Sequence, residues 1–433
     1  MRFARSVSIT LVSKGLVILT GIVTSILTAR LLGPSGRGVL AVFLAITGIA
    51  TQVGGLGLHA APSYYISQDK SLLSRLVPLL MSYSLIAGSF LGTLFIIAFA
   101  AFPAFYSGMN WIFVLLAAIT IIPSISVPLL QGLLLGVEDF VGYNAGELAY
   151  RVFYMIGIVI VLYLLKLHLH SALAMTSAAI FFNAAAFLFF LNRKGAKPAL
   201  IFDTSLFKRI YSYGLRAYLV ALLSYLVVRS DIFILNYLRG PSDTGIYSIA
   251  VQFADLIFVF PVTLSTMLFP KVASGFADAE FTVKVSRFTS FVLGGICILT
   301  YLSAKWIIPF MFSNQFLASV PALDLLLVGV YSYGMMSVIS SYFGGKGMPL
   351  RTVLIWIPGL LLNVALNLIL IPRIGVNGAS ISSTIAYFLI FILYAEYFRK
   401  ETGKSPFDLV IPRRRDFRDI SDLVRLKLAS MNK

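Results

Sequence analysis

The stretch "SYLVVRSDIFILNYL" (224–238) has the character of an apolar helix interrupted by two charged residues, Arg229 and Asp231. Two further cations, Lys14 and Arg216, stand in similarly apolar surroundings. A cation at the centre of a bilayer costs about 2.5–3.5 kcal/mol on insertion scales, so such residues mark functional sites. Unpaired cations in a water-filled cleft can hold several oxygens of a phosphate at once. The sequence therefore predicts recognition of an anion within a membrane.

The composition of the chain is that of a membrane protein. Of its 433 residues, 59% are hydrophobic and 12% are charged, whereas soluble domains are roughly half apolar and a quarter charged. A helix of about 20 apolar residues crosses a bilayer. Runs of that length occur near 7–29, 38–60, 76–101, 111–135, 147–165, 171–192, 211–237, 245–269, 285–304, 320–343, 352–371 and 376–398. We expect an all-α integral membrane protein with about twelve transmembrane helices.

The basic residues predict the orientation of these helices. Lys and Arg gather near the two termini and in the connections after every second apolar run, as they do on the cytoplasmic side of membrane proteins. We therefore expect a multi-pass protein of the plasma (inner) membrane with both termini in the cytoplasm. The same scattered distribution argues against nucleic acid as the partner that the net charge of +17 would attract.

Two matches at a common shift of 207 residues indicate an internal repeat. "LLGPSGRGVLA" (31–41) aligns with "LRGPSDTGIYS" (238–248), and "LLKLHLHSALA" (164–174) aligns with "IPRIGVNGASI" (371–381). Parallel repeats of this kind form two lobes that rock around a central cavity. We expect a six-helix lobe at 1–192, a cytoplasmic linker at 193–210, a second six-helix lobe at 211–398 and a basic cytoplasmic tail at 399–433. Within the tail, 416–431 predicts an amphipathic helix on the anionic inner leaflet.

Three motifs resemble those of the Wzx-type polysaccharide-biosynthesis flippases, which belong to the multidrug/oligosaccharidyl-lipid/polysaccharide exporter superfamily. They are "ARLLGPSGRG" (29–38), Asp231 followed by "GIY" (245–247), and "NVALNLILIPRIGVNGAS" (363–380). The resemblance covers the chain to about residue 398. It implies a flippase that moves undecaprenyl-pyrophosphate-linked oligosaccharide from the cytoplasmic to the outer leaflet by alternating access. It also implies membrane lipids, and a polymerase or glycosyltransferases of the same pathway, as partners.

We expect Lys14 and Arg229 to receive the pyrophosphate, with Arg216 gathering it on the inner side. Arg216 and Arg229 are thirteen residues apart, about 20 Å along a helix and roughly 140° around it, so they do not point into one cavity unless the helix bends. Four acidic residues are candidates for ion coupling or helix positioning: Asp231, Asp255, Glu147 and Asp324.

The sequence contains no signature of catalysis or of a bound cofactor. It lacks a G-x-x-x-x-G-K-[ST] phosphate loop, and His168 and His170 make a poor metal site by themselves. We therefore expect a transporter without cofactor or metal, and coupling to the membrane potential, Na⁺ or H⁺ stays open. The alternatives are a cation-coupled multidrug antiporter of the same superfamily, a major-facilitator transporter, and a membrane polymerase or ligase of the polysaccharide pathway.

Overall fold

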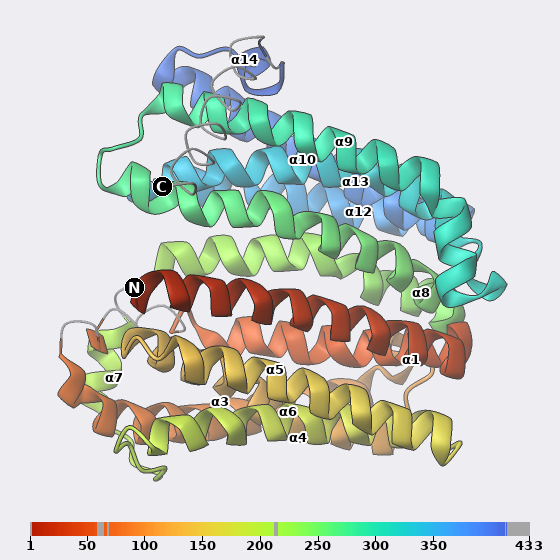
Figure 1. The fold of residues 1–433 in the computed structure, drawn as a ribbon. Coiled ribbons are helices and arrows are strands. Elements are labelled where there is room, and N and C mark those ends of the chain that lie inside the picture. The colour runs from red at the N-terminus through yellow and green to blue at the C-terminus, as the bar shows by residue number, and fades with distance from the viewer. Residues whose placement is uncertain (1, 59–64, 67–68, 212–214, 412, 414–433) are drawn as a thin grey trace. The chain divides into compact units, whose positions relative to one another are not determined.

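The computed structural model of the 433-residue chain describes all residues except 1, 59–64, 67–68, 212–214, 412 and 414–433. Over the described ranges every regular element is a helix (Figure 1). The expected all-α fold class is therefore confirmed. The predicted amphipathic segment 416–431 lies outside the described residues.

Ten helices in the described part of the chain are long and apolar enough to cross a membrane. Many large apolar side chains are exposed on them, including Phe90, Leu299 and Phe310, as expected of surfaces that face lipid. In chain order the longer elements are α1 (Arg2–Gly55), α3 (Leu73–Ala101), α4 (Trp111–Gly136), α5 (Phe140–Ile158) continued by η3 (Val159–Leu164), α6 (Leu169–Asn192), α7 (Thr204–Tyr211), α8 (Leu215–Ala273), α9 (Ala279–Phe312), α10 (Ser319–Gly345), α12 (Trp356–Ile374) and α13 (Val376–Thr402). The short elements are η1 (Lys70–Leu72), η2 (Pro103–Tyr106), η4 (Asn314–Phe316), α11 (Leu350–Leu354) and α14 (Pro406–Val410).

Two of these helices, α1 and α8, each contain two membrane crossings. Their apolar spans of 43 and 56 residues would measure about 65 and 84 Å if straight, against about 30 Å for a bilayer core. Each is broken by a non-helical glycine, Gly33 (φ 66°, ψ −178°) and Gly240 (φ 84°, ψ −179°). The Arg37 guanidinium lies 2.8 Å from the Thr28 hydroxyl, nine residues earlier, because the chain reverses at Gly33. With each counted twice, the ten helices supply the twelve crossings expected.

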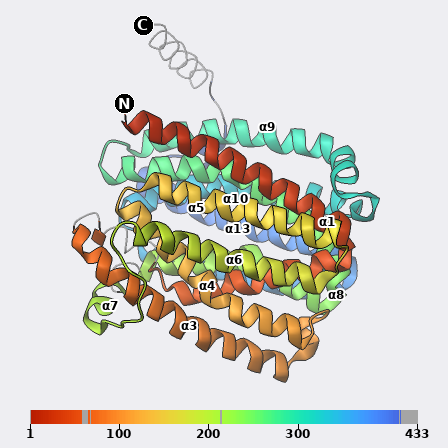
Figure 2. The same cartoon turned by 60° about the horizontal axis from the view of Figure 1, so that its bottom comes forward.

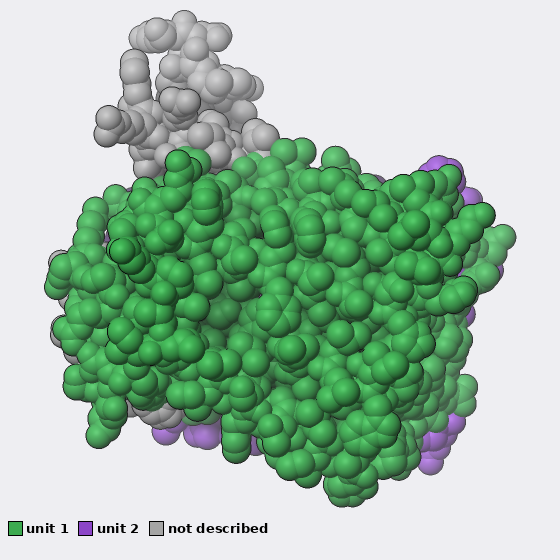
Figure 3. Space-filling view, turned by 90° about the horizontal axis from the view of Figure 1, so that it is seen from below, with its two compact units in different colours: residues 1–248, 311–315 green, residues 249–310, 316–433 purple. Residues whose placement is uncertain are grey.

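The chain forms two compact units, which Figure 3 shows in different colours. Unit 1 comprises 1–248 and 311–315, and unit 2 comprises 249–310 and 316–433. Within unit 1, α5 packs against α1 and α6, and α4 packs against α3 and α6 (Figures 1 and 2). Within unit 2, α13 packs against α10 and α12. The division into lobes at 192 and 211 stays a prediction.

Helix boundaries repeat at nearly the shift found in the sequence. The first residues of α6 and α13, Leu169 and Val376, differ by 207 positions. Those of α4 and α10 (111 and 319) differ by 208, and those of α3 and α9 (73 and 279) by 206. The reversal glycines at 33 and 240 again differ by 207. The packing of α6 on α4 and α5 also recurs as that of α13 on α10 and α12. The two halves of the chain therefore repeat one succession of helices.

The two copies of the Gly-Pro-Ser-x-x-Gly motif contact each other within unit 1. A Cβ atom on Gly38 would lie 1.8 Å from the Pro241 carbonyl oxygen, and one on Gly245 would lie 1.8 Å from the Pro34 carbonyl oxygen. Real side chains do not approach a backbone so closely, so both positions require glycine. The repeated motif thus forms a reciprocal backbone contact between the two helix reversals.

The segment predicted as a linker, 193–210, is part of unit 1 and is held against its helices by ion pairs. Arg75 in α3 lies 2.5 Å from Asp203, and Lys194 lies 3.1 Å from Asp139. Leu206 in α7 is 5% exposed. The segment after α6 therefore has defined contacts with the helices that precede it.

Candidate functional site

A column of polar residues lines the contact between α1 and α5 in unit 1. On α5 these residues are Tyr143, Glu147, Tyr150, Arg151 and Tyr154. Their spacing of four, three, one and three residues places them along one face of the helix. Figure 2 shows α5 running beside the first half of α1. Polar groups on that face are therefore held against α1 inside unit 1.

Lys14 and Glu147, predicted as separate candidates, form an ion pair across this contact. The Lys14 ammonium lies 2.8 Å from the Glu147 carboxylate, and it donates to the Tyr143 hydroxyl at 3.4 Å. It also lies 5.3 Å from the centroid of the Tyr143 ring. The side chain of Lys14 is 44% exposed and that of Glu147 is 17% exposed. Lys14 is therefore not the unpaired cation that the site hypothesis assumed, although much of it stays accessible.

Arg151 is a second cation at this contact, and the sequence analysis missed it. It lies near the middle of the membrane-length segment Phe140–Leu164. Its Nε atom is buried and has no hydrogen-bond partner among the described residues. The guanidinium carbon lies 5.3 Å from the centroid of the Tyr150 ring. The signal was available, since Arg151 falls inside the apolar run 147–165.

Small residues on α1 leave room beside Arg151. A Cβ atom placed on Gly21 would lie 3.9 Å from the Arg151 Nη1 atom, and it would contact nothing else within 4 Å. Gly21 follows Lys14 by seven residues, so both lie on the same face of α1. Beside the guanidinium there is therefore room for at least one further carbon atom, on the face of α1 that carries Lys14.

The polar column continues to the reversal of α1. The Tyr154 hydroxyl lies 3.1 Å from the Thr176 hydroxyl of α6. Beyond it, Arg37 donates to Thr28 at 2.8 Å and to Ser248 at 3.3 Å. These contacts tie α5 to α6 and close the α1 reversal, so they hold the α1–α5 face in place.

Asp231 has a structural partner. It is 1% exposed and accepts a hydrogen bond from the Tyr247 hydroxyl, which is fully buried. In a straight helix sixteen residues would separate them by about 24 Å, so this bond joins the two arms of α8 on either side of Gly240. The Asp and Gly-x-Tyr parts of one sequence motif therefore meet, and the geometry favours helix positioning for Asp231.

The other predicted residues are distributed over both units. Arg229 is half-buried in the arm of α8 that belongs to unit 1. The side chain of Arg216 lies outside what the structure describes. Asp255 and Asp324 belong to unit 2, in α8 and α10, and Asp324 has a buried carboxylate oxygen without a hydrogen-bond partner. No group of three His, Cys, Asp or Glu among the described residues could hold a metal ion.

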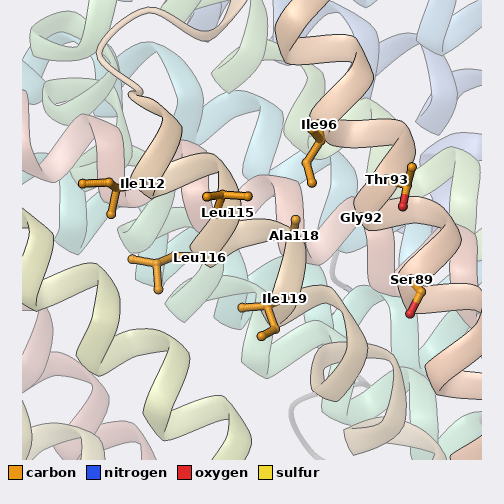
Figure 4. A pocket seen from close by; sticks show the side chains of 9 residues that line it. All are labelled: Ser89, Gly92, Thr93, Ile96, Ile112, Leu115, Leu116, Ala118 and Ile119. Carbon is orange, nitrogen blue, oxygen red and sulfur yellow. The ribbon is translucent and has the colours of Figure 1, made fainter.

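An apolar groove of about 570 Å³ lies between α3 and α4 of unit 1 (Figure 4). Its walls contain no charged side chain, and they consist of Ser89, Gly92, Thr93, Ile96, Ile112, Leu115, Leu116, Ala118 and Ile119. The two helices meet closely where a Cβ on Gly88 would lie 2.7 Å from the Ile122 Cα. A groove of this character fits hydrocarbon, whereas the α1–α5 face carries charged side chains.

Comparison with protein families identifies the chain. The sequence profile of the family described as "Polysaccharide biosynthesis protein" matches residues 3–276. The chain belongs to this family. The match includes α1 and α5 and therefore the Lys14, Glu147 and Arg151 positions. An uncharacterized membrane protein of Methanocaldococcus jannaschii is 25% identical over 214 residues, which are 48% of this chain and 42% of that protein. The match thus spans less than half the length of this relative.

Solved structures show the same fold. The lipid II flippase MurJ in an inward closed conformation superposes with a TM-score of 0.72 at 17% identity, over 98% of this chain and 92% of that one. An inward-facing multidrug resistance MATE family transporter of the MOP superfamily gives 0.71 at 16% identity, over 89% and 94%. A MOP superfamily transporter from Pyrococcus furiosus, whose binding pocket is described as having reverse polarity, gives 0.62 at 16%, over 92% and 94%. At these identities the likeness concerns the fold alone. The chain is a multi-pass membrane protein with a MOP-type transporter fold.

Proposed function

We propose that this protein is a flippase that moves undecaprenyl-pyrophosphate-linked oligosaccharide from the cytoplasmic to the outer leaflet by alternating access. Membership of the polysaccharide biosynthesis family supports the substrate class. On this proposal the protein is a transporter of the plasma (inner) membrane with both termini in the cytoplasm, and it serves surface polysaccharide assembly.

The observation that carries the proposal is the pair of cations on the α1–α5 face. Lys14 and Arg151 stand inside membrane-length helices, one partly exposed and the other with an unused buried donor. A pyrophosphate has several charged oxygens, and charge-assisted hydrogen bonds from Lys and Arg offset its removal from water. Arg229 is the further cation that the proposal assigns to the headgroup, and Arg216 is the inner gatherer. The isoprenoid tail stays in the bilayer while the headgroup crosses.

The membrane potential can drive this movement. With the interior about 100 mV negative, moving two negative charges outward is downhill by about 4.6 kcal/mol. A uniporter therefore needs no dedicated coupling site. If Na⁺ or H⁺ is exchanged instead, the acidic candidates are Asp231, Asp255, Glu147 and Asp324, and the Tyr247 contact of Asp231 makes it the least available of them.

A leaflet-protection assay in liposomes tests the proposal. Purified protein is reconstituted with a fluorescent polyprenyl-pyrophosphate sugar, and the fraction of label that reaches the outer leaflet is measured with a membrane-impermeant quencher. We expect movement of this lipid and no export of a cationic dye. The variant with Lys14→Ala and Arg229→Ala should lose most of the movement. The control variant with Arg239→Ala and Lys305→Ala, two exposed cations in α8 and α9, should keep it.

Export of the dye without movement of the lipid would contradict the proposal and support the multidrug antiporter. Coupling is read in the same liposomes by imposing either a potential or a Na⁺ or H⁺ gradient. A response to the gradients and none to the potential would replace the uniporter by an exchanger. Cleavage or polymerisation of the sugar lipid would instead support the membrane polymerase or ligase.

A further inference from the structure

The α1–α5 face holds one carboxylate between two cations, and the two cations differ in their partners. The Glu147 carboxylate forms an ion pair with the Lys14 ammonium, with 2.8 Å between Oε2 and Nζ. Arg151 follows Glu147 by four residues, so it lies on the same face of α5 one turn further along, about 6 Å away. Arg151 has no carboxylate partner among the described residues, and its Nε atom is buried without a hydrogen bond.

We propose that Arg151 binds the anionic headgroup directly and that Glu147 is a resident competitor which the headgroup displaces from Lys14. This inference rests on the proposed function and adds to it the role of Glu147 and the order in which the two cations bind. In the empty protein Glu147 neutralises Lys14, so that on this face of α1 and α5 Arg151 is the cation that attracts an anion. When a diphosphate arrives, one phosphate binds Arg151 and the other replaces the Glu147 carboxylate at Lys14.

The geometry of the face is suited to a diphosphate. Glu147, which holds Lys14, and Arg151 are about one helical turn apart on α5, so two linked phosphate groups could contact both cations where a single phosphate would contact one. Arg offers a planar fork of donors that binds phosphate oxygens in pairs. Gly21 leaves room for a further atom beside Nη1, since a Cβ there would lie 3.9 Å from Nη1 and within 4 Å of no other atom.

Displacement also gives the site a means of release. A headgroup held by two cations with no competitor would bind tightly, and tight binding slows departure. Glu147 lies 17% exposed beside Lys14, so it can return to the ammonium as the diphosphate leaves. The carboxylate thus weakens binding of the diphosphate and thereby speeds its release.

Binding measurements separate this role from a structural one. The protein is placed in nanodiscs of zwitterionic phosphatidylcholine, and the affinity for inorganic pyrophosphate is measured by calorimetry. Arg151→Gln should weaken binding by about tenfold to a hundredfold, as expected for loss of hydrogen bonds to a charged group. Glu147→Gln should strengthen binding by about threefold to tenfold, because Lys14 becomes available.

The opposite signs are the decisive feature. If Glu147 only held α1 against α5, its substitution would weaken binding, and that result would overturn the displacement model. Unchanged binding in Arg151→Gln would overturn the direct contact. Arg239→Gln removes a cation that pairs with Asp243 at the exposed end of a helix, and it should have no effect.

A second pair of variants keeps the test valid if Arg151→Gln fails to fold. Gly21→Val fills the space beside the guanidinium and should weaken pyrophosphate binding about tenfold. Gly15→Val is its matched control, because a Cβ at Gly15 meets nothing within 4 Å. Equal affinity of the two variants would count against the site.

A competition experiment with a lipid distinguishes a lipid-linked diphosphate from free pyrophosphate as the ligand. A short polyprenyl pyrophosphate should compete with inorganic pyrophosphate and bind at least about tenfold more tightly, because its tail enters the bilayer. Equal affinity would overturn a lipid ligand for this site. If the pattern of variants holds while wild-type liposomes move no lipid-linked sugar, the anion site stands and the proposed function fails.

Discussion

The two halves of the chain share their helices but not their charges. The reversal glycines and the glycines of the reciprocal contact recur at a shift of 207, whereas Lys14 corresponds to Ala221, Glu147 to Leu354 and Arg151 to Pro358. The residues that shape the backbone are thus repeated, whereas the three charged residues of the α1–α5 face have no charged counterpart in the second half. In a protein built from two similar halves, binding residues can be located at the positions where the halves differ.

The second half has a polar cluster of another kind, at other positions. Asn363 donates to Ser383 at 3.3 Å and accepts from Asn367 at 2.9 Å, and all three residues are 0% exposed. These neutral amides are sealed between α12 and α13, as polar residues that join membrane helices commonly are. The charged face of α1 and α5 is partly exposed instead. Exposure and charge together distinguish a candidate site from structural polar packing.

The largest loss of stability is expected at the reciprocal contact, where each half of the chain requires a glycine. Gly38→Val would place side-chain atoms on the Pro241 carbonyl, against which even a Cβ would lie at 1.8 Å. The variant should lose more than about 3 kcal/mol of stability, because neither backbone can give way. Thermal unfolding of the purified protein checks this. Gly295→Ala in α9 meets nothing within 4 Å and should leave the melting temperature nearly unchanged, and similar losses in both variants would contradict the contact.

A smaller loss of stability is expected when the hydrogen bond between Tyr247 and Asp231 is removed, a bond that the reversal of α1 does not have. Asp231 and Tyr247 correspond to Thr24 and Leu40 in the first half, so only α8 has this hydrogen bond. Asp231→Ala should cost about 2–3 kcal/mol, since the buried Tyr247 hydroxyl loses its acceptor. In a double-mutant cycle with Tyr247→Phe, the two losses should not add. Full additivity in thermal unfolding would show that the bond contributes nothing.

The sealed amides should affect stability and leave transport intact. Asn363→Leu removes partners of both Ser383 and Asn367, which should cost about 1–2 kcal/mol. Because this cluster is not exposed, the rate of lipid movement per folded protein should equal that of the wild type. The leaflet assay, normalised to reconstituted protein, measures it. A selective loss of transport would place a second functional site in unit 2.

The smallest change in stability is expected from the ion pairs that hold the segments after α6 and α13 against neighbouring helices. Arg75 of α3 pairs with Asp203, and Arg287 of α9 pairs with Asp408 at 3.2 Å. Arg75 is 60% exposed and Arg287 is 8% exposed, so Arg287→Ala should lower the melting temperature more than Arg75→Ala does.

The contribution of the Arg75–Asp203 pair to stability should depend on pH. The Ser205 hydroxyl, the Leu206 backbone N–H and the Arg75 guanidinium hold the pKa of Asp203 well below its usual range. A depressed pKa contributes stability above its ordinary value of about 4, and that contribution is lost as the pH falls below it. Melting temperatures at falling pH should therefore converge for the wild type and Asp203→Asn. A constant difference between them down to strongly acidic pH would argue against the assigned contacts.

Local sequence patterns predict much of this fold, because apolar length and Gly-Pro turns are local signals. The twelve crossings and the reversals at Gly33 and Gly240 follow from them. The Lys14–Glu147 pair could not be predicted, since it depends on the register of α1 against α5, residues 133 positions apart. Arg151 could have been found as a cation within an apolar run, but only its surroundings show that its Nε atom has no partner.

The central claim is that the charged face of the first half, and not its counterpart in the second, carries the anionic headgroup. The direct measurement is the leaflet-protection rate of a polyprenyl-pyrophosphate sugar with substitutions at equivalent positions. Lys14→Ala combined with Arg151→Gln should reduce the rate by at least about a hundredfold, while Ala221→Ser, at the position equivalent to Lys14, should leave it within about twofold of the wild type. Equal rates for all three proteins, at equal amounts of folded protein, would contradict the account.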